Sequence, residues 1–176
     1  MHTEWSELFG TTELFVEGAA FRQWLATLAS KRLGLQSPEA VQAAMQAYDE
    51  REQRPRMVGN VAVIDVTGCL TYRTGWYGAY FGLSGVADLQ QKFRLALADP
   101  AVKTIVFRFD SPGGEVAGNF ELARQLLTAR GNKPVWGHAN EGAYSAAYSL
   151  LATTDRIAVP QAGSVGSIGV VMVHVD

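Results

Sequence analysis

The chain has 176 residues, of which 48% are hydrophobic and 18% charged, and its formal net charge is −2. This composition suits a compact globular domain and lacks the basic excess expected of a protein that binds nucleic acid. With Cys69 as its single cysteine, the chain cannot form an internal disulfide, and we expect this residue to be buried and apolar in a reducing compartment.

The N-terminal third is predicted to be helical. It carries no secretory signal, and no apolar stretch approaches the ~20 residues that span a bilayer, so we expect a cytoplasmic protein without a membrane partner. One helix is predicted over 13–33, and a second begins at Ser37, which precedes a proline as N-cap residues often do. Charged residues dominate 49–56 and indicate a linker. We therefore expect residues 1–56 to form an appendage used for assembly, and residues 57–176 to form an α/β domain.

Beyond this linker, strands and helices are predicted to alternate. Strands are expected near 61–66, 102–109, 134–140 and 157–159, and helices over 84–98 with Ser84 as the cap, 116–130 and 145–153. The segment 102–109 is almost continuously apolar, which predicts a strand buried on both faces. In the helix 116–130 the apolar stripe consists of Phe120, Ala123 and Leu127. The alternation predicts right-handed crossovers on a mostly parallel sheet.

Two further segments carry apolar side chains. Residues 71–85 form a glycine-rich loop whose aromatics include Trp76, Tyr77, Tyr80 and Phe81. Because exposed aromatic groups are unfavourable in water, we expect this loop to close on another subunit or a bound peptide, or else to fold back on its own core. The run 168–175 is predicted to be a last strand.

Two turns are predicted to meet at one edge of the sheet. Residues 110–114 and 142–145 each follow a strand, and the carboxyl ends of parallel strands lie at the same edge. Ser145 begins a helix among small residues, where its hydroxyl could act as a nucleophile if a base removes the proton. The backbone amides predicted to bind the resulting oxyanion are those of Gly114, Gly113 and Ala146. Each turn alone is also typical of an ordinary cap or loop.

A peptide substrate is predicted to bind this edge as an extended strand. Glycines leave backbone groups open for such pairing beside 114–116 and 164–168. The predicted substrate-binding residues are Glu115, Val116, Gly166 and Ser167. No cofactor, metal or nucleic acid is expected.

Three motifs in this order resemble the signal peptide peptidase A family, and most closely its bacteriophage capsid-assembly proteases. They are Asp-Ser-Pro-Gly-Gly at 110–114, Ser-Ala-Ala-Tyr at 145–148 with Asp-Arg-Ile at 155–157, and Gly-Ser-Val-Gly-Ser-Ile-Gly-Val at 163–170. The resemblance covers about residues 58–176. It implies a crotonase- and Clp-protease-like ββα superhelix, a serine nucleophile at Ser145 and a lysine general base. It further implies processing of phage scaffold and head proteins by a homo-oligomer in the bacterial cytoplasm or procapsid.

The lysine that the resemblance implies has no counterpart at its expected place. In the family it follows the Gly-Ser-Ile-Gly-Val strand, whereas no lysine follows Lys133 in this sequence. We therefore expect the base to lie beyond Asp176, and this chain to be a truncated fragment without activity of its own. Lys103 and Lys133 are expected at the far ends of their strands, roughly 20 Å from the serine. The remaining lysines are Lys31, in the appendage, and Lys92, expected on the polar face of a helix.

Other functions remain open from the residues. His174, near the end of the last predicted strand, is an alternative base, whereas His138 is expected to be a packed or surface residue. A crotonase-type acyl-thioester enzyme would use the amide pair without a serine nucleophile, so Ser145→Ala should spare it. A catalytically silent assembly subunit of the same fold is the third alternative.

Overall fold

The computed structural model describes residues 54–74, 78 and 82–171, and residues 37, 39, 40, 42, 43 and 46 of the N-terminal segment. The chain divides into two compact units, Met1–Gln42 and Ala43–Asp176. The predicted helix 13–33 and the loop aromatics Trp76, Tyr77, Tyr80 and Phe81 lie outside the described residues. The use of residues 1–56 for assembly stays a prediction. No helix in the described parts of the chain has the length and apolar character needed to cross a bilayer.

The predicted cap at Ser37 is confirmed. Its hydroxyl oxygen accepts a hydrogen bond from the Ala40 amide at 3.2 Å, as an N-cap side chain does in the first turn of a helix. The Glu39 carboxylate accepts a hydrogen bond from its own backbone amide and one from the Ser37 side chain, and these two bonds lower its pKa.

Within the described residues, the main sheet has six strands in the order β1-β2-β5-β6-β7, with β8 paired to the C-terminal part of β6. Their bounds are β1 Arg56–Val58, β2 Val61–Thr67, β5 Thr104–Ser111, β6 Val135–Tyr144, β7 Arg156–Ala158 and β8 Ser164–Gly166. All pairs are parallel except β1 and β2. A second, two-stranded sheet joins β3, Leu70–Thr71, to β4, Ser84–Gly85. The expected α/β class with a mostly parallel sheet is confirmed.

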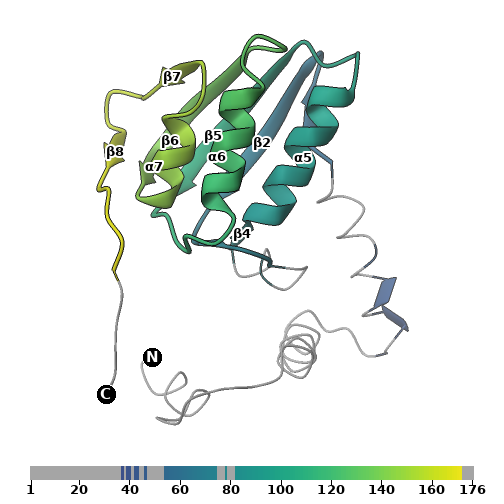
Figure 1. The fold of residues 1–176 in the computed structure, drawn as a ribbon. Coiled ribbons are helices and arrows are strands. Elements are labelled where there is room, and N and C mark those ends of the chain that lie inside the picture. The colour runs from purple at the N-terminus through teal and green to yellow at the C-terminus, as the bar shows by residue number, and fades with distance from the viewer. Residues whose placement is uncertain are drawn as a thin grey trace. The chain divides into compact units, whose positions relative to one another are not determined.

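Three helices lie side by side on one face of this sheet (Figure 1). They are α5 Val86–Ala98, α6 Asn119–Thr128 and α7 Ala146–Leu151. On the opposite face the Arg108 guanidinium, 45% exposed, pairs with Asp65 at 2.7 Å across β5 and β2. The expectation that 102–109 is buried on both faces is therefore wrong. Side chains of β5 alternate between buried and accessible because the described helices cover only one face.

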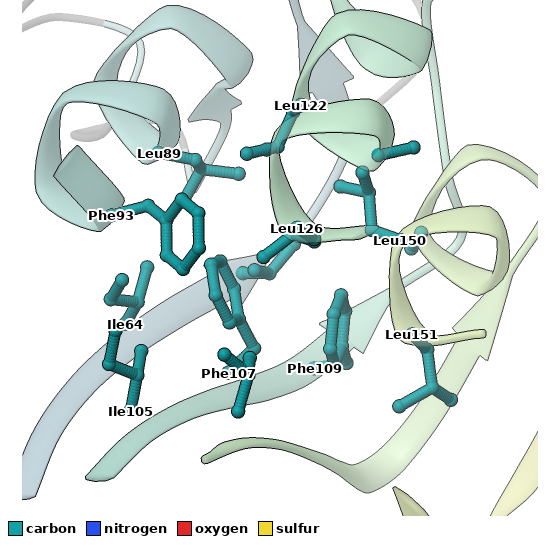
Figure 2. Packing of buried hydrophobic residues seen from close by; sticks show 14 of the residues in the cluster. Ile64, Leu89, Phe93, Ile105, Phe107, Phe109, Leu122, Leu126, Leu150 and Leu151 are labelled. Carbon is teal, nitrogen blue, oxygen red and sulfur yellow. The ribbon is translucent and has the colours of Figure 1, made fainter. Parts of the chain in front are cut away.

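The core fills the space between the helices and that face (Figure 2). Phe107 on β5 packs against Phe93 of α5 with ring centroids 5.8 Å apart, and against Phe109. The helices contribute Leu89, Leu122, Leu126, Leu150 and Leu151, all at most 2% exposed. These contacts fix the height of each helix above its strand, and so the position of the turns at the strand ends.

The buried face of α6 differs from the predicted stripe. Phe120 is 64% exposed and Leu127 is 46% exposed, whereas Leu122 and Leu126 point into the core. Only Ala123 of the predicted stripe is buried. Both sets recur at helical spacing, and the helix turns the leucines at 122 and 126 toward the sheet.

Three single-residue expectations are also corrected. Ser84 does not cap α5, because it lies in β4 and its hydroxyl exchanges hydrogen bonds with the Thr67 backbone at 2.8 and 2.9 Å. Cys69 is exposed in the turn between β2 and β3, where its neighbour Leu70 takes the buried place. Lys92 lies among the buried residues of α5 instead of on a polar face.

Candidate active site

Strand β6 leads directly into Ser145, and α7 begins at the next residue. Ser145 has φ 52° and ψ −121°, a conformation that side-chain-bearing residues rarely adopt and that typically costs about 1–3 kcal/mol. Its side chain makes no capping hydrogen bond, so Ser145 is not an ordinary N-cap. Its amide donates to the Gly166 carbonyl of the adjacent β8 segment at 2.9 Å. The backbone on both sides therefore holds the serine in a strained conformation.

The turn after β5 lies against this serine. Gly113 is buried with φ 95°, and a Cβ atom placed on it would lie 2.7 Å from Ser145 Cβ and 3.0 Å from the Ala146 nitrogen. Real Cβ atoms do not approach other atoms as closely as 2.7 Å, so only glycine fits between these groups. The expected meeting of the two turns at one sheet edge is confirmed.

The amide of Gly113 is already hydrogen-bonded. It donates to the Ser111 hydroxyl at 3.1 Å, and that hydroxyl donates to the Gly68 carbonyl at 2.6 Å. This amide is therefore not available as an oxyanion donor, which corrects the expectation for Gly113. The role of Ser111 went unrecognised in the sequence, although a serine two residues before a glycine is a known side-chain-to-backbone turn pattern.

Gly114 presents its amide differently. Leu70 of β3 donates to the Gly113 carbonyl and accepts from the Glu115 amide, both at 2.8 Å. Backbone groups of successive residues in an extended segment face opposite sides, so the Gly114 amide between them points away from Leu70. Gly114 is exposed, and a Cβ atom on it would overlap the Leu70 carbonyl. Together with the Ala146 amide at the start of α7, this leaves two candidate donors beside the serine.

The predicted substrate-binding residues border the same turns. One carboxylate oxygen of Glu115 accepts a hydrogen bond from the Tyr72 amide at 2.8 Å. This bond connects the end of β3 to the segment after Gly114. The Val116 side chain is 42% exposed. Gly166 stands in register with Tyr144 beside the serine, and Ser167, with φ 53°, is exposed.

Among the described residues, no lysine or histidine forms a hydrogen bond with Ser145. Its hydroxyl donates to the Gly169 carbonyl at a long 3.5 Å. The Lys133 ammonium donates to the carbonyls of Ala96 and Asp99 at 2.8 and 2.5 Å, at the C-terminal end of α5. This end lies where β6 begins, whereas the serine lies where β6 ends.

The other candidate bases are also placed elsewhere or lie outside the described residues. The Lys103 ammonium donates to the Pro100 carbonyl at 3.1 Å, at the beginning of β5. Lys92 belongs to α5, which α6 separates from α7 (Figure 1). His138 pairs with the neighbouring strands seven residues before the serine, roughly 20 Å away along an extended strand. His174 and Lys31 are not among the described residues.

Comparison with known proteins identifies phage relatives, although no family model matches the chain. The chain is 39% identical over 121 residues to the head-tail preconnector protein GP5 of Enterobacteria phage P21, over 69% of this chain and 24% of that protein. It is 38% identical over 125 residues to the capsid assembly protease C of Escherichia phage lambda, over 70% of this chain and 28% of that protein. The chain thus spans about a quarter of the length of these curated relatives.

A similar solved structure is that of a mutant of the 1510-N membrane-bound stomatin-specific protease. The TM-score is 0.48 at 17% sequence identity, and the match covers 68% of this chain and 53% of that one.

Proposed function

We propose that this chain carries the nucleophile of a serine endopeptidase. The premise is that the chain is a relative of the phage capsid assembly proteases and resembles the signal peptide peptidase A family. The observation that carries the proposal is the strained backbone of Ser145, held against Gly113 without any capping bond to explain it. Strained conformations of this kind gather at active sites, where they hold a reactive group in place.

The proposed reaction begins with attack of the Ser145 hydroxyl on the scissile carbonyl carbon. A general base removes the hydroxyl proton, and the carbonyl oxygen becomes an oxyanion. The amides of Gly114 and Ala146 donate to this oxyanion, while Gly113 contributes close packing. Losing one such donor typically lowers the rate by about 10²–10³. The leaving amine departs with a proton from the base, and water then releases the acyl group.

The general base we propose is a lysine, as the resemblance implies, from a part of the protein beyond the described residues. The positions of Lys103 and Lys133 support this, because both ammonium groups bind carbonyls at the opposite edge of the sheet. A base must come within about 3 Å of the proton that it removes. We therefore expect residues 1–176 alone to show no turnover of casein or small peptides, with activity restored by an extension that supplies the lysine. Turnover that disappears in His174→Ala would replace the Ser-Lys pair with a Ser-His pair.

The proposed substrates are phage scaffold and head proteins, cleaved by a homo-oligomer during procapsid maturation. The names of the two phage relatives support this assignment. The substrate is proposed to bind as an extended strand beside 114–116 and the outer edge of β8.

Labelling with a fluorophosphonate tests the nucleophile in the full-length gene product. We expect the probe to label the wild-type protein and the Ser37→Ala control, and to leave Ser145→Ala unlabelled and unable to cleave a head-protein substrate. Peptide cleavage retained by Ser145→Ala would refute the assignment. Failure of the wild-type protein to react would instead favour a silent assembly subunit.

A further inference from the structure

A hydrogen-bonded chain connects α6 to the first turn of α7. Asn119, the first residue of α6, is 3% exposed, and its Nδ2 atom donates to the Ser149 hydroxyl at 2.5 Å. The Ser149 hydroxyl in turn donates to the Ala146 carbonyl at 2.7 Å. A hydroxyl has only one proton to donate. Because the side-chain amide of Asn119 donates to the Ser149 oxygen, the Ser149 proton points to the Ala146 carbonyl.

Ser149 also holds the preceding peptide unit. Its backbone amide donates to the Ser145 carbonyl at 3.0 Å, and this carbonyl belongs to the same peptide group as the Ala146 amide. Ser149 therefore bonds the peptide groups on both sides of Ala146. The position of Ser149 therefore determines the orientation of the Ala146 amide, which we assign as a hydrogen-bond donor to the oxyanion.

A contribution to folding stability does not explain why residue 119 is an asparagine. Within the described part of the chain, its Oδ1 atom is buried without a hydrogen-bond partner. A buried unpaired acceptor destabilises a protein, and such an atom in a folded structure calls for an explanation. Leucine, of similar size, would remove the unpaired oxygen and would also remove the bond to Ser149.

We propose that Asn119 is a positioning residue for the oxyanion site. It orients the Ser149 hydroxyl and so fixes the first turn of α7, with the Ser145 hydroxyl and the Ala146 amide, against the Gly113–Gly114 turn. The inference rests on the proposed peptidase function and adds a residue that touches neither the substrate nor the reacting atoms.

The test measures kcat, KM and thermal midpoint in the full-length gene product, with a head-protein peptide as substrate. Asn119→Leu and Ser149→Ala are expected to lower kcat about tenfold to 100-fold while KM changes less than about twofold, since misplacement of a catalytic group by about 1 Å can cost about 10²-fold. Asn119→Leu should keep or raise the midpoint. The double variant should be no slower than Ser149→Ala, because both changes act through one hydroxyl.

Thr153, in the turn that follows α7, provides a matched control. Its hydroxyl donates to the Leu150 carbonyl at 2.7 Å, the same type of bond as that of Ser149, but one turn away from the serine. Thr153→Val should leave kcat unchanged.

Several results would overturn the inference. Wild-type kcat in Asn119→Leu, with Ser145→Ala inactive, would refute the positioning role and leave the proposed function intact. A loss of kcat in Thr153→Val equal to that in Ser149→Ala would show general loosening of α7 and would also refute it. If Asn119→Leu does not fold, Ser149→Ala decides the question alone. Activity in Ser145→Ala would remove the proposed function itself.

Discussion

At Gly113, beside the serine, both the available space and the backbone conformation exclude a side chain. An alanine there would carry φ 95° and place its Cβ atom 2.7 Å from Ser145 Cβ. Gly131 has a nearly equal φ of 89°, but nothing lies within 4 Å of its Cβ position, so it is a matched control. We expect Gly131→Ala to lose about 1–2 kcal/mol from the backbone alone. Gly113→Ala should lose more and abolish fluorophosphonate labelling in the full-length protein. Equal unfolding free energies in denaturant titrations, with labelling retained, would contradict the packing described at this turn.

The conformation of Ser145 gives a second prediction at this scale. Glycine adopts φ 52° without steric cost, whereas alanine keeps the strain. Both Ser145→Gly and Ser145→Ala should be inactive, and the glycine variant should be more stable by about 1 kcal/mol. At this chain length, that difference corresponds to roughly 2–4 °C in Tm. A glycine variant that melts below the alanine variant would argue against stored strain.

At the scale of elements, β8 offers an edge for an incoming strand. The Gly166 carbonyl faces the β6 side, where it accepts from Ser145, so the amide of the preceding Val165 points to the outer edge. Val165→Pro should remove this donor without breaking the pairing with β6, because edge strands tolerate proline there. We expect KM for a peptide substrate to rise about tenfold, the magnitude of one lost hydrogen bond, with kcat unchanged.

Gly166→Pro provides the contrast to that variant. Gly166 has φ 128°, a value that proline cannot adopt. The substitution should therefore disrupt the turn at Ser145 and lower kcat as well. An unaltered KM in Val165→Pro would place the substrate away from this edge.

At the scale of the whole molecule, the predicted appendage can be removed without cutting the sheet. Strand β1 begins at Arg56 and pairs with β2, so a deletion of residues 1–53 keeps every described strand. We expect the remainder to stay folded by circular dichroism and to change its oligomeric state in light scattering. An unfolded remainder would show that these residues belong to the core, and an unchanged oligomer would remove their proposed role in assembly.

Local patterns in the sequence were enough to predict the main strands and helices of the described α/β domain and the place of the two turns. The last strand was predicted wrongly, because residues 168–171 lie outside any strand and this part of the chain forms β8 at Ser164–Gly166 instead. Strands β2, β5, β6 and β7 and helix α5 fall where apolar runs and helical spacing predict them. Parallel strands bring their carboxyl ends to one edge whatever the details of packing, so the contact between Gly113 and Ser145 could be predicted. The short strands β3 and β4 give no periodic signal because each has only two residues.

The tertiary structure decided which side of each element is buried and which backbone groups are occupied. Apolar spacing on α6 was compatible with two faces, and only packing against the sheet selected Leu122 and Leu126 over Phe120. The Gly113 amide was lost as a donor through a network that reaches back 43 residues, from Ser111 to Gly68. Hydrogen bonds between groups so distant in the chain leave no trace in local periodicity, because they exist only after the sheet has brought those groups together.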